Sequence, residues 1–275
     1  MKNKQTALQR LASAPYLVWA AVFVVVPLAV VAYFAFTDKA GAFTLQNIAK
    51  IGEQVDTFVL SILLGAVATV ICLLVSYPVA YIISRMKVSR QRTMLMLVML
   101  PMWMNLLLRT YALMNILEDT GLINRLLTFL GLPNVHMINT AGAVVLGMVY
   151  NFLPYMIMPL YSIMTKVDNT IVEAAQDLGA SSFQIFRRVI FPLSVPGIAS
   201  GITMVFVPSV STFYISQKLG GAGYMLIGDV IDTKFNYENN YNVGAALSLV
   251  LMVLILICMA VMNEFTEEDG EAMLV

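Results

Sequence analysis

Six long apolar runs constrain this chain more than any other feature of its sequence. Each is almost free of charge and can supply the roughly 20 residues that a helix needs to cross about 30 Å of hydrocarbon. The runs lie within residues 11–37, 57–84, 93–117, 137–165, 189–217 and 239–263. Because a spanning helix satisfies its backbone hydrogen bonds internally, we predict an all-α, polytopic membrane protein with six transmembrane helices.

The composition agrees with this prediction and excludes several classes of protein. Of 275 residues, 60% are hydrophobic and 12% are charged, and the mean hydropathy is +0.83. The formal net charge is zero, so no general basic surface indicates a nucleic-acid partner. The first apolar run is too long for the core of a cleaved signal peptide, and we expect it to remain as a membrane anchor.

Lysine and arginine are divided unevenly between the two sides of the predicted membrane domain. The N-terminal tail and the segments after the second and fourth runs hold ten of them, and the opposite loops hold five. By the positive-inside rule, both termini and the segment around Thr170 are predicted to be cytoplasmic. The expected organisation is a tail (1–10), a six-helix domain (11–263) with a cytoplasmic loop (166–194), and an acidic tail (264–275).

A polar, helix-forming segment at residues 170–201 lies between the fourth and fifth runs. Thr170 and Glu173 have the spacing of a capping box at the start of a short helix. Gly179 follows six residues later and can end that helix in the left-handed conformation. We therefore predict one short helix that begins at Thr170 and ends before Gly179.

A second short helix is predicted directly after the glycine. Ser181 and Gln184 repeat the capping-box spacing, and Pro192 is expected to stop the helix because it has no N–H to donate. Two short helices joined by a glycine bend would then lie between two membrane spans. Such a unit is well shaped to be bound by another protein.

Few residues offer catalytic or metal-binding chemistry. The chain has no Gly-Lys pair, so the phosphate-binding loop of ATPases is absent. The single histidine, His136, has no Cys, Asp or Glu at metal-ligand spacing, and no nucleophilic triad can be assembled around it. We expect no catalytic residue, no metal site and no directly bound cofactor.

Arg109 is the one charge embedded within an apolar run. A charge in the membrane costs at least roughly 2.5 kcal/mol and should face the interior of the helix bundle or a water-filled cavity. Asn105 lies one helical turn earlier, and Trp103 and Tyr111 are close by in sequence. These four residues are candidates for the lining of a translocation path. Arg109 has two alternative roles, as a hydrogen-bonding lock between helices or as a side chain that reaches the membrane interface.

The segment Glu173–Gly201 resembles the EAA loop of bacterial ABC importer permeases. Glu173, Ala174, Ala175 and Gly179 match the first part of its motif, and Ile190, Phe191 and Pro192 stand in the distal part, with Phe where Leu is commoner. The resemblance implies the type I permease fold and a loop that docks on a cytoplasmic ATPase. It assigns the docking face to Ala174, Ala175 and Gly179, with Glu173 and Asp177 at its polar edge.

Three further stretches, residues 100–113, 150–164 and 213–231, resemble the permease subunits of spermidine/putrescine importers. This resemblance implies a heterodimer with a second permease, two cytoplasmic ATPase subunits that use ATP and Mg²⁺, and an extracytoplasmic polyamine-binding protein. The cargo would carry several ammonium groups, which bind carboxylates and aromatic faces.

The resemblance also suggests residues for the cargo path. Phe213 and Tyr214 would form a cation gate at the outer end of the fifth span, and Asp229 and Asp232 would receive the ligand or the binding protein. An interfacial aromatic belt is the alternative for the two aromatic residues. Gln217 stands where the family would have an acidic residue.

Two other functions stay open at this point. The same kind of importer could carry another small solute, such as thiamine or ferric iron. A secondary transporter or channel driven by ions is disfavoured, because no carboxylate is embedded in the six runs and a docking unit is present.

Overall fold

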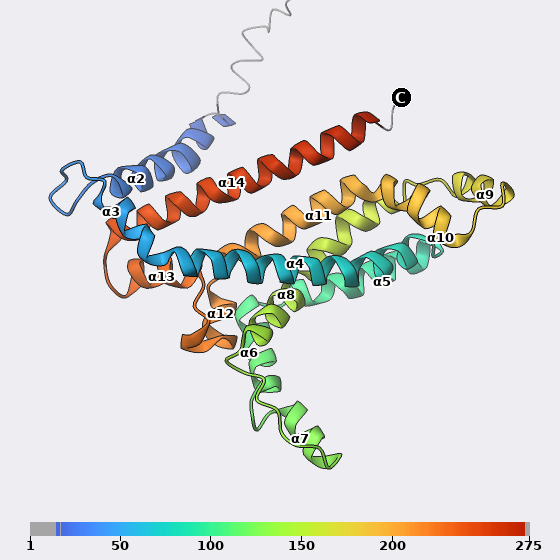
Figure 1. Ribbon diagram of the computed structural model, residues 1–275, viewed down its shortest axis with the longest axis horizontal. Helices are drawn as coiled ribbons and strands as arrows, with labels where there is room; N and C mark the ends of the chain where they lie inside the picture. The colour runs from blue at the N-terminus through green and yellow to red at the C-terminus, as the bar shows by residue number, and fades with distance from the viewer. Residues whose placement is uncertain (1–14, 17, 273–275) are drawn as a thin grey trace, which may run out of the picture. The chain divides into compact units, whose positions relative to one another are not determined.

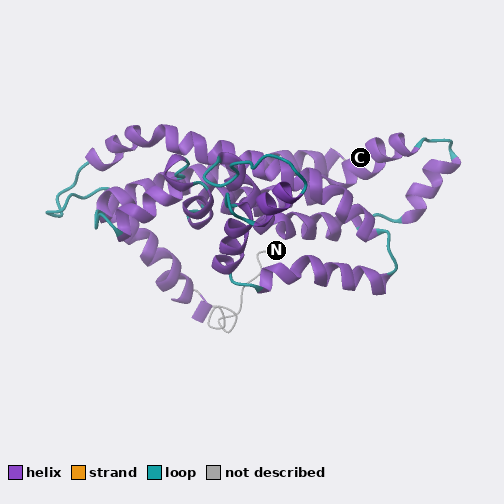
Figure 2. Cartoon of the chain, turned by 90° about the horizontal axis from the view of Figure 1, so that it is seen from below, coloured by secondary structure: helices purple, strands orange, loops and turns teal. Residues whose placement is uncertain are grey.

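The computed structural model describes residues 15, 16 and 18–272, and nearly every element in this part of the chain is a helix (Figures 1 and 2). Among the described residues, five helical segments are long and apolar enough to cross a membrane. They are Val18–Ala35, Gln46–Ser84, Ala141–Met164, Ser182–Ser211 and Tyr241–Val261. A sixth candidate is a bent pair of helices, so the prediction of an all-α membrane protein with six spans is confirmed if that pair is counted as one span.

The described chain divides into two compact units. The first contains the segment up to Val55 together with Val230–Val253, and the second contains Asp56–Asp229 together with the segment from Leu254 onward. The predicted docking loop and all but one of the predicted path residues fall in the second unit. The exception is Asp232, in the first unit.

The first unit is stabilised by close packing of small residues and by asparagine side chains. Its helices are η1 (Ala21–Val25), α2 (Val26–Ala35), α3 (Gln46–Ala49), η2 (Lys50–Gln54) and parts of α13 (Ile227–Asn236) and α14 (Tyr241–Ala272). Ala35 and Ala245 lie in its core. Asn47 and Asn242 both donate hydrogen bonds to the carbonyl of Thr37, at 2.8 and 2.7 Å. These bonds satisfy a carbonyl at the end of α2 that has no helical partner.

The second unit is built around α8 and α11, which pack along each other. Its helices are α4 (Val55–Ser84), α5 (Val88–Met99), η3 (Leu100–Trp103), α6 (Leu106–Leu117), α7 (Leu122–Phe129), α8 (Ala141–Met164), α9 (Asn169–Asp177), α10 (Ser182–Ile185), η4 (Phe186–Ile190), α11 (Phe191–Ser211), α12 (Tyr214–Leu219) and η5 (Gly221–Gly223). A Cβ at Gly197 would lie 3.1 Å from the carbonyl of Pro159, and one at Gly201 would meet Met156. These two glycines therefore allow α8 and α11 to approach each other closely.

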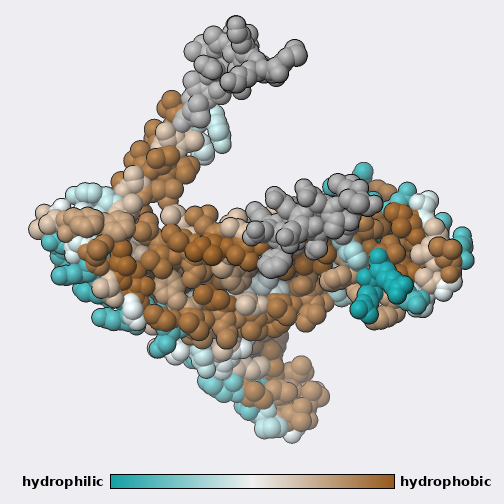
Figure 3. Space-filling view, turned by 45° about the horizontal axis from the view of Figure 1, so that its top comes forward, coloured by the Kyte–Doolittle hydropathy of each residue, from teal (hydrophilic) through white to brown (hydrophobic). Residues whose placement is uncertain are grey.

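Two clusters of buried side chains stabilise the second unit along α8. One cluster includes Val144 and Met148 of α8 with Leu219 of α12, and the other includes Met156 of α8 with Val205 of α11. On the face shown in Figure 3, apolar side chains cover the long helices, and hydrophilic side chains gather at the end that carries α9 and α10. The predicted docking loop therefore lies at a polar end of the α8–α11 pair.

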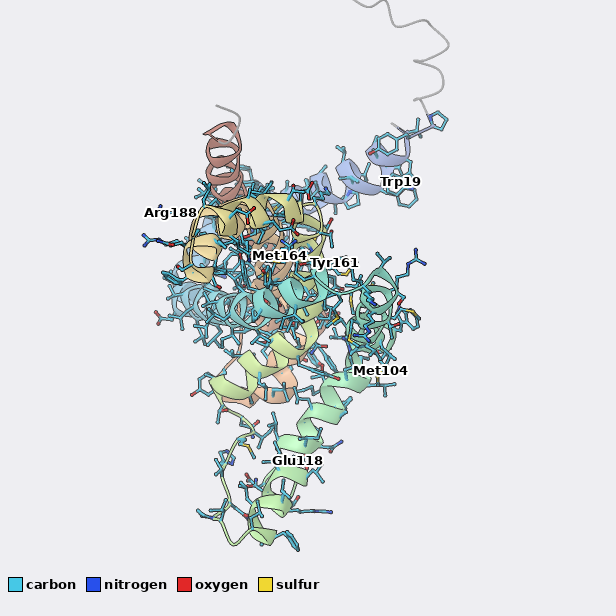
Figure 4. All side chains as sticks on the ribbon, turned by 90° about the vertical axis from the view of Figure 1, so that its right-hand side faces the viewer. Trp19, Met104, Glu118, Tyr161, Met164 and Arg188 are labelled. Carbon is cyan, nitrogen blue, oxygen red and sulfur yellow. The ribbon has the colours of Figure 1, made fainter. Side chains whose placement is uncertain are left out.

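The third apolar run is not one straight helix, which corrects its predicted course over residues 93–117. The helices Val88–Trp103 and Leu106–Phe129 meet at 90°, and Met104 marks the bend in Figure 4. Pro101 lies in the 3₁₀ turn that precedes the bend. Asn105 then caps a new helix, because its side chain accepts the N–H of Leu107 at 2.7 Å.

The helix that begins after Ser181 does not stop at Pro192, contrary to the prediction. α10, η4 and α11 form one helical segment, Ser182–Ser211. The middle part, Phe186–Ile190, is a π-helical turn in which the N–H of Phe191 bonds to the carbonyl of Phe186. A π turn widens the helix just before Pro192, so the pyrrolidine ring fits and the helix continues in the same direction.

Candidate functional site

The N-cap of α9 lies two residues earlier than the sequence indicated, and the helix itself begins at Asn169. Asp168 is its N-cap, and the Asp168 carboxylate accepts the N–H of Thr170 at 3.0 Å. The predicted capping box of Thr170 and Glu173 is therefore wrong, because Thr170 already lies in the first helical turn. The same hydrogen bond lowers the pKa of Asp168 below its ordinary value of 3.8.

The end of α9 is formed as predicted by Gly179. Its φ is +78°, in the left-handed region. The N–H of Gly179 bonds to the carbonyl of Gln176 at 2.8 Å, and the N–H of Ala180 bonds to that of Ala175 at 3.0 Å. This pair of bonds is the Schellman motif, which reverses the chain direction over few residues.

The start of α10 also matches its prediction. Ser181 accepts the N–H of Gln184 at 3.4 Å, and the Gln184 side chain accepts the N–H of Ser181 at 2.8 Å. Both halves of the capping box are thus formed. A Schellman turn that leads directly into a capping box leaves no flexible linker between α9 and α10, so their relative direction is set by hydrogen bonds.

The predicted docking residues lie together on this short unit and largely face solvent. Glu173, Ala174, Asp177 and Gly179 are exposed, and Ala175 is half-buried. Large apolar side chains stand next to them, which the sequence analysis did not single out. Leu178 is 89% exposed and Phe183 is 69% exposed, and Arg188 in the following turn points outward in Figure 4. Exposed apolar side chains ringed by polar ones mark a surface for a protein partner.

The predicted path residues of the third run are separated by the bend. Trp103 is 74% exposed. The side-chain oxygen of Asn105 is engaged in capping α6, so it does not serve Arg109. Arg109 is only 7% exposed, and within the described part of the chain its Nε and Nη1 have no hydrogen-bond partner. The guanidinium faces the protein interior, in agreement with the expectation for a charge in an apolar run.

Two of the predicted path residues, Tyr111 and Tyr214, meet between α6 and α12. Their ring centroids are 6.1 Å apart and the rings are nearly perpendicular, at 79°. The Nζ of Lys218 lies 5.4 Å from the Tyr111 ring centroid and 5.8 Å from that of Tyr214. We refer to Tyr111, Tyr214 and Lys218 as the tyrosine–lysine cluster.

The sequence pattern predicts both tyrosines as path residues but does not indicate Lys218. The available signal was its spacing, because Tyr214 and Lys218 are four residues apart and share one face of a helix. Phe213 is the residue that precedes α12, and it is 43% exposed.

The two predicted acidic residues have different surroundings. Asp229 is fully buried in the first turn of α13, and its Oδ2 accepts the N–H of Leu226 at 2.7 Å. The next N–H, from Ile227, bonds to Ser61 of α4 at 2.8 Å. Asp229 therefore helps to cap α13 at a point where that helix is joined to α4. Asp232, in the first compact unit, accepts a hydrogen bond from Asn236 at 2.7 Å.

Comparison with known proteins gives a family and several relatives. Residues 76–265 match the family model described as binding-protein-dependent transport system inner membrane component. The spermidine/putrescine transport system permease protein PotB of Haemophilus influenzae is 37% identical over 92% of both chains. PotB of Escherichia coli is 36% identical over 86% of this chain and 89% of its own.

A solved structure shows the same fold. It is a crystal structure of a bacterial ABC transporter involved in the import of the acidic polysaccharide alginate, with a TM-score of 0.76, 16% identity and 95% of each chain covered. At this level of identity, the likeness concerns the fold alone. The family match and the PotB relatives establish the protein family. The chain belongs to the binding-protein-dependent transport system inner membrane components, which are the multi-pass permeases of ABC importers.

Proposed function

We propose that this chain forms one half of the transmembrane path of an ATP-driven importer of polyamines, spermidine or putrescine. The observation that carries the proposal is the similarity to PotB permeases over nearly the whole chain, at 37% identity for the Haemophilus influenzae protein. The aromatic pair Tyr111 and Tyr214 supports a cationic cargo, because tyrosine faces attract ammonium groups.

The proposed assembly contains this chain and four other subunits. A second, related permease completes the path, two cytoplasmic ATPases bind ATP and Mg²⁺, and an extracytoplasmic protein delivers the polyamine. This chain supplies no ATPase site and binds no cofactor directly. A related structure of the alginate transporter, in complex with a periplasmic protein that binds alginate pentasaccharide, supports the place of a binding protein in such an assembly.

The proposed coupling element is the α9–α10 unit. Closure of the ATPase dimer would move Glu173, Ala174, Ala175, Asp177 and Gly179, and the motion would pass into α11. The path would then open outward to the docked binding protein and return inward after ATP hydrolysis. The support is that α9 and α10 are joined by a hydrogen-bonded turn and that α10 continues into α11 without a break.

Transport in proteoliposomes tests the function directly. The purified complex of this chain with its companions is reconstituted with the binding protein, and uptake of labelled spermidine is measured with ATP inside the vesicles. We expect uptake that unlabelled putrescine reduces and that a hydrolysis-deficient ATPase subunit abolishes. Uptake that persists with the inactive ATPase would indicate a secondary transporter. Competition by thiamine or ferric iron, and none by polyamines, would assign another cargo.

The coupling role is tested separately with Leu178. Because Leu178 is 89% exposed, Leu178→Glu should leave the folding of this chain intact. We expect the variant to insert normally but to lose co-purification with the ATPase subunits. Leu132→Glu is the matched control, since Leu132 is 52% exposed in the loop between α7 and α8, at the other end of α8. Equal recovery of the ATPase with both variants would contradict the assignment of α9–α10.

A further inference from the structure

An ammonium group of the chain itself occupies the aromatic site between α6 and α12. The Lys218 Nζ lies within 6 Å of two ring centroids, at 5.4 Å for Tyr111 and 5.8 Å for Tyr214. Both distances fall within the range in which the negative face of an aromatic ring attracts a cation. The two rings meet edge to face, so a single cation can contact both.

The position of Lys218 is set by the rest of α12. Ile215 and Leu219 are fully buried, and they hold this short helix against α8. Lys218 lies in the last turn of α12 and is half-buried. Its ammonium is therefore brought to the rings by the packing of its own helix.

Among the described residues, the two tyrosines hold this ammonium and no carboxylate forms an ion pair with it. Within the described part of the chain, the ion pairs are His136 with Asp119 and Lys234 with Glu238, and neither includes Lys218. Tyr111 is 40% exposed, so the cluster can be reached from outside. A free ammonium ion that arrives there can compete with Lys218 on equal chemical terms, because both are alkylammonium groups.

We propose that Lys218 is a tethered occupant of an alkylammonium site formed by Tyr111 and Tyr214, and that cationic cargo must displace it to pass. The inference rests on the proposed function, since only a cationic cargo would compete for this site. Lys218 then sets the cargo concentration at which the importer works: without it, the site is empty and accepts cargo at lower concentration.

Removing the charge tests the competition. Lys218→Met keeps the length of the side chain and deletes the ammonium. In the reconstituted complex, we expect the concentration of spermidine that gives half-maximal uptake to fall about three- to tenfold, equivalent to about 0.7–1.4 kcal/mol at 1.4 kcal/mol per factor of ten. Lys218→Arg should remain near wild type, because a guanidinium also stacks on tyrosine. Lys234→Met is the control for loss of one lysine elsewhere, and it should change nothing.

A double substitution distinguishes competition for the aromatic site from simple repulsion between Lys218 and the cargo. If Lys218 competes at the rings, the gain from Lys218→Met disappears when Tyr111→Leu is also present, since the site itself is gone. If the gain persists in the double variant, the ammonium acts only through its charge and the proposal fails. An unchanged or raised half-maximal concentration for Lys218→Met overturns it as well, and a raised value would indicate that Lys218 supports the folded path instead of competing with the cargo.

Amine labelling tests the site without relying on transport, so its failure can be told apart from failure of the proposed cargo. The purified complex is treated with an acetylating reagent in tetramethylammonium chloride or in sodium chloride, and acetylation of each lysine is read by mass spectrometry. We expect tetramethylammonium to raise labelling of Lys218 by about threefold, because a quaternary ammonium takes its place on the rings. Labelling of Lys234 should stay constant. Equal labelling of Lys218 in both salts overturns the proposal even if spermidine is transported.

Discussion

At the scale of single residues, Gly179 is restricted by its backbone conformation. Its φ of +78° is a conformation that side chains with a Cβ rarely adopt, yet no atom lies within 4 Å of the position of a Cβ. A substitution there is therefore limited by backbone strain and not by space. Glycine is therefore favoured by the Schellman turn itself, which sets the direction of α9 relative to α10.

Gly179→Val should abolish uptake while leaving membrane insertion intact. A β-branched residue in the left-handed region costs about 1–3 kcal/mol, enough to unwind a turn that only two hydrogen bonds maintain. Asparagine tolerates this region, so Gly179→Asn should keep most of the uptake. Both variants are compared by spermidine uptake and by the amount of assembled complex. If the two lose uptake equally, the conformation of the turn is not what matters at this position.

Asp168 gives a prediction for the pH dependence of the α9 cap. Because its pKa is lowered in the folded chain, the ionised carboxylate stabilises α9 at and above the ordinary aspartate pKa of 3.8 and loses this effect only as the pH falls further. Amide hydrogen exchange of α9, corrected for its intrinsic pH dependence, should show this loss. Asp168→Asn caps the helix without titrating, so its protection should not change over the same pH range.

The residues that were predicted wrongly or missed share a cause. Asp168 and Thr170 are both good capping residues two positions apart, and local preference alone does not decide between them. The local sequence around Lys218 does not indicate a contact, because one of the rings that its ammonium faces belongs to Tyr111, more than a hundred residues away. Gly179 and Ser181 were predicted correctly because their roles depend only on neighbours along the chain.

At the scale of elements, the same division between local and long-range causes holds. The existence of the helices follows from apolar length, which is a local property. Continuation through Pro192 and the bend at Met104 depend on how backbone strain is relieved, by a π turn in one case and by a 3₁₀ turn with a new N-cap in the other. A proline in the sequence permits either outcome, so the sequence alone could not distinguish a stop from a continued helix.

The start of α13 gives a prediction about close packing between elements. A Cβ at Gly228 would lie 2.6 Å from the carbonyl oxygen of Thr212 and 2.7 Å from that of Ser211. These are backbone atoms that cannot turn aside, so Gly228→Ala should destabilise the protein by about 1–3 kcal/mol. Gly223→Ala is the matched control, because nothing lies within 4 Å of its Cβ position. Thermal unfolding of the purified complex measures both, and equal melting temperatures would contradict this contact.

At the scale of the whole molecule, the distribution of lysine and arginine predicts the orientation of the chain in the membrane. Ten of the lysines and arginines in the tail and loops lie on one side and five on the other, so both termini and the α9–α10 unit should be cytoplasmic. With the native Cys72 and Cys258 replaced by alanine, single cysteines at the exposed positions Phe43 and Leu132 should react with a membrane-impermeant maleimide in intact cells. A single cysteine at Leu178 should react only after lysis. The reverse pattern would invert the topology and remove α9–α10 from the ATPase side.

The family could be recognised from the EAA segment, and the relatives at 36–37% identity agree with that recognition. Cargo is harder to predict, because it depends on a few side chains that converge from separate helices. Of the predicted path residues, the structure brings Tyr111 and Tyr214 together, whereas Trp103 and Arg109 lie on opposite sides of the bend.

The continuity of Ser182–Ser211 makes this segment a lever arm. Thirty helical residues span about 45 Å, so a tilt of about 10° at one end displaces the other by about 8 Å. In the proposed coupling, the end that follows the Ser181 cap would be the driven one, and the far end is separated from Tyr214 by Thr212 and Phe213 only. A displacement of the end near α10 would therefore be transmitted to the tyrosine–lysine cluster with little loss. Release of the cargo would then coincide with the helix movement and would not depend on diffusion alone.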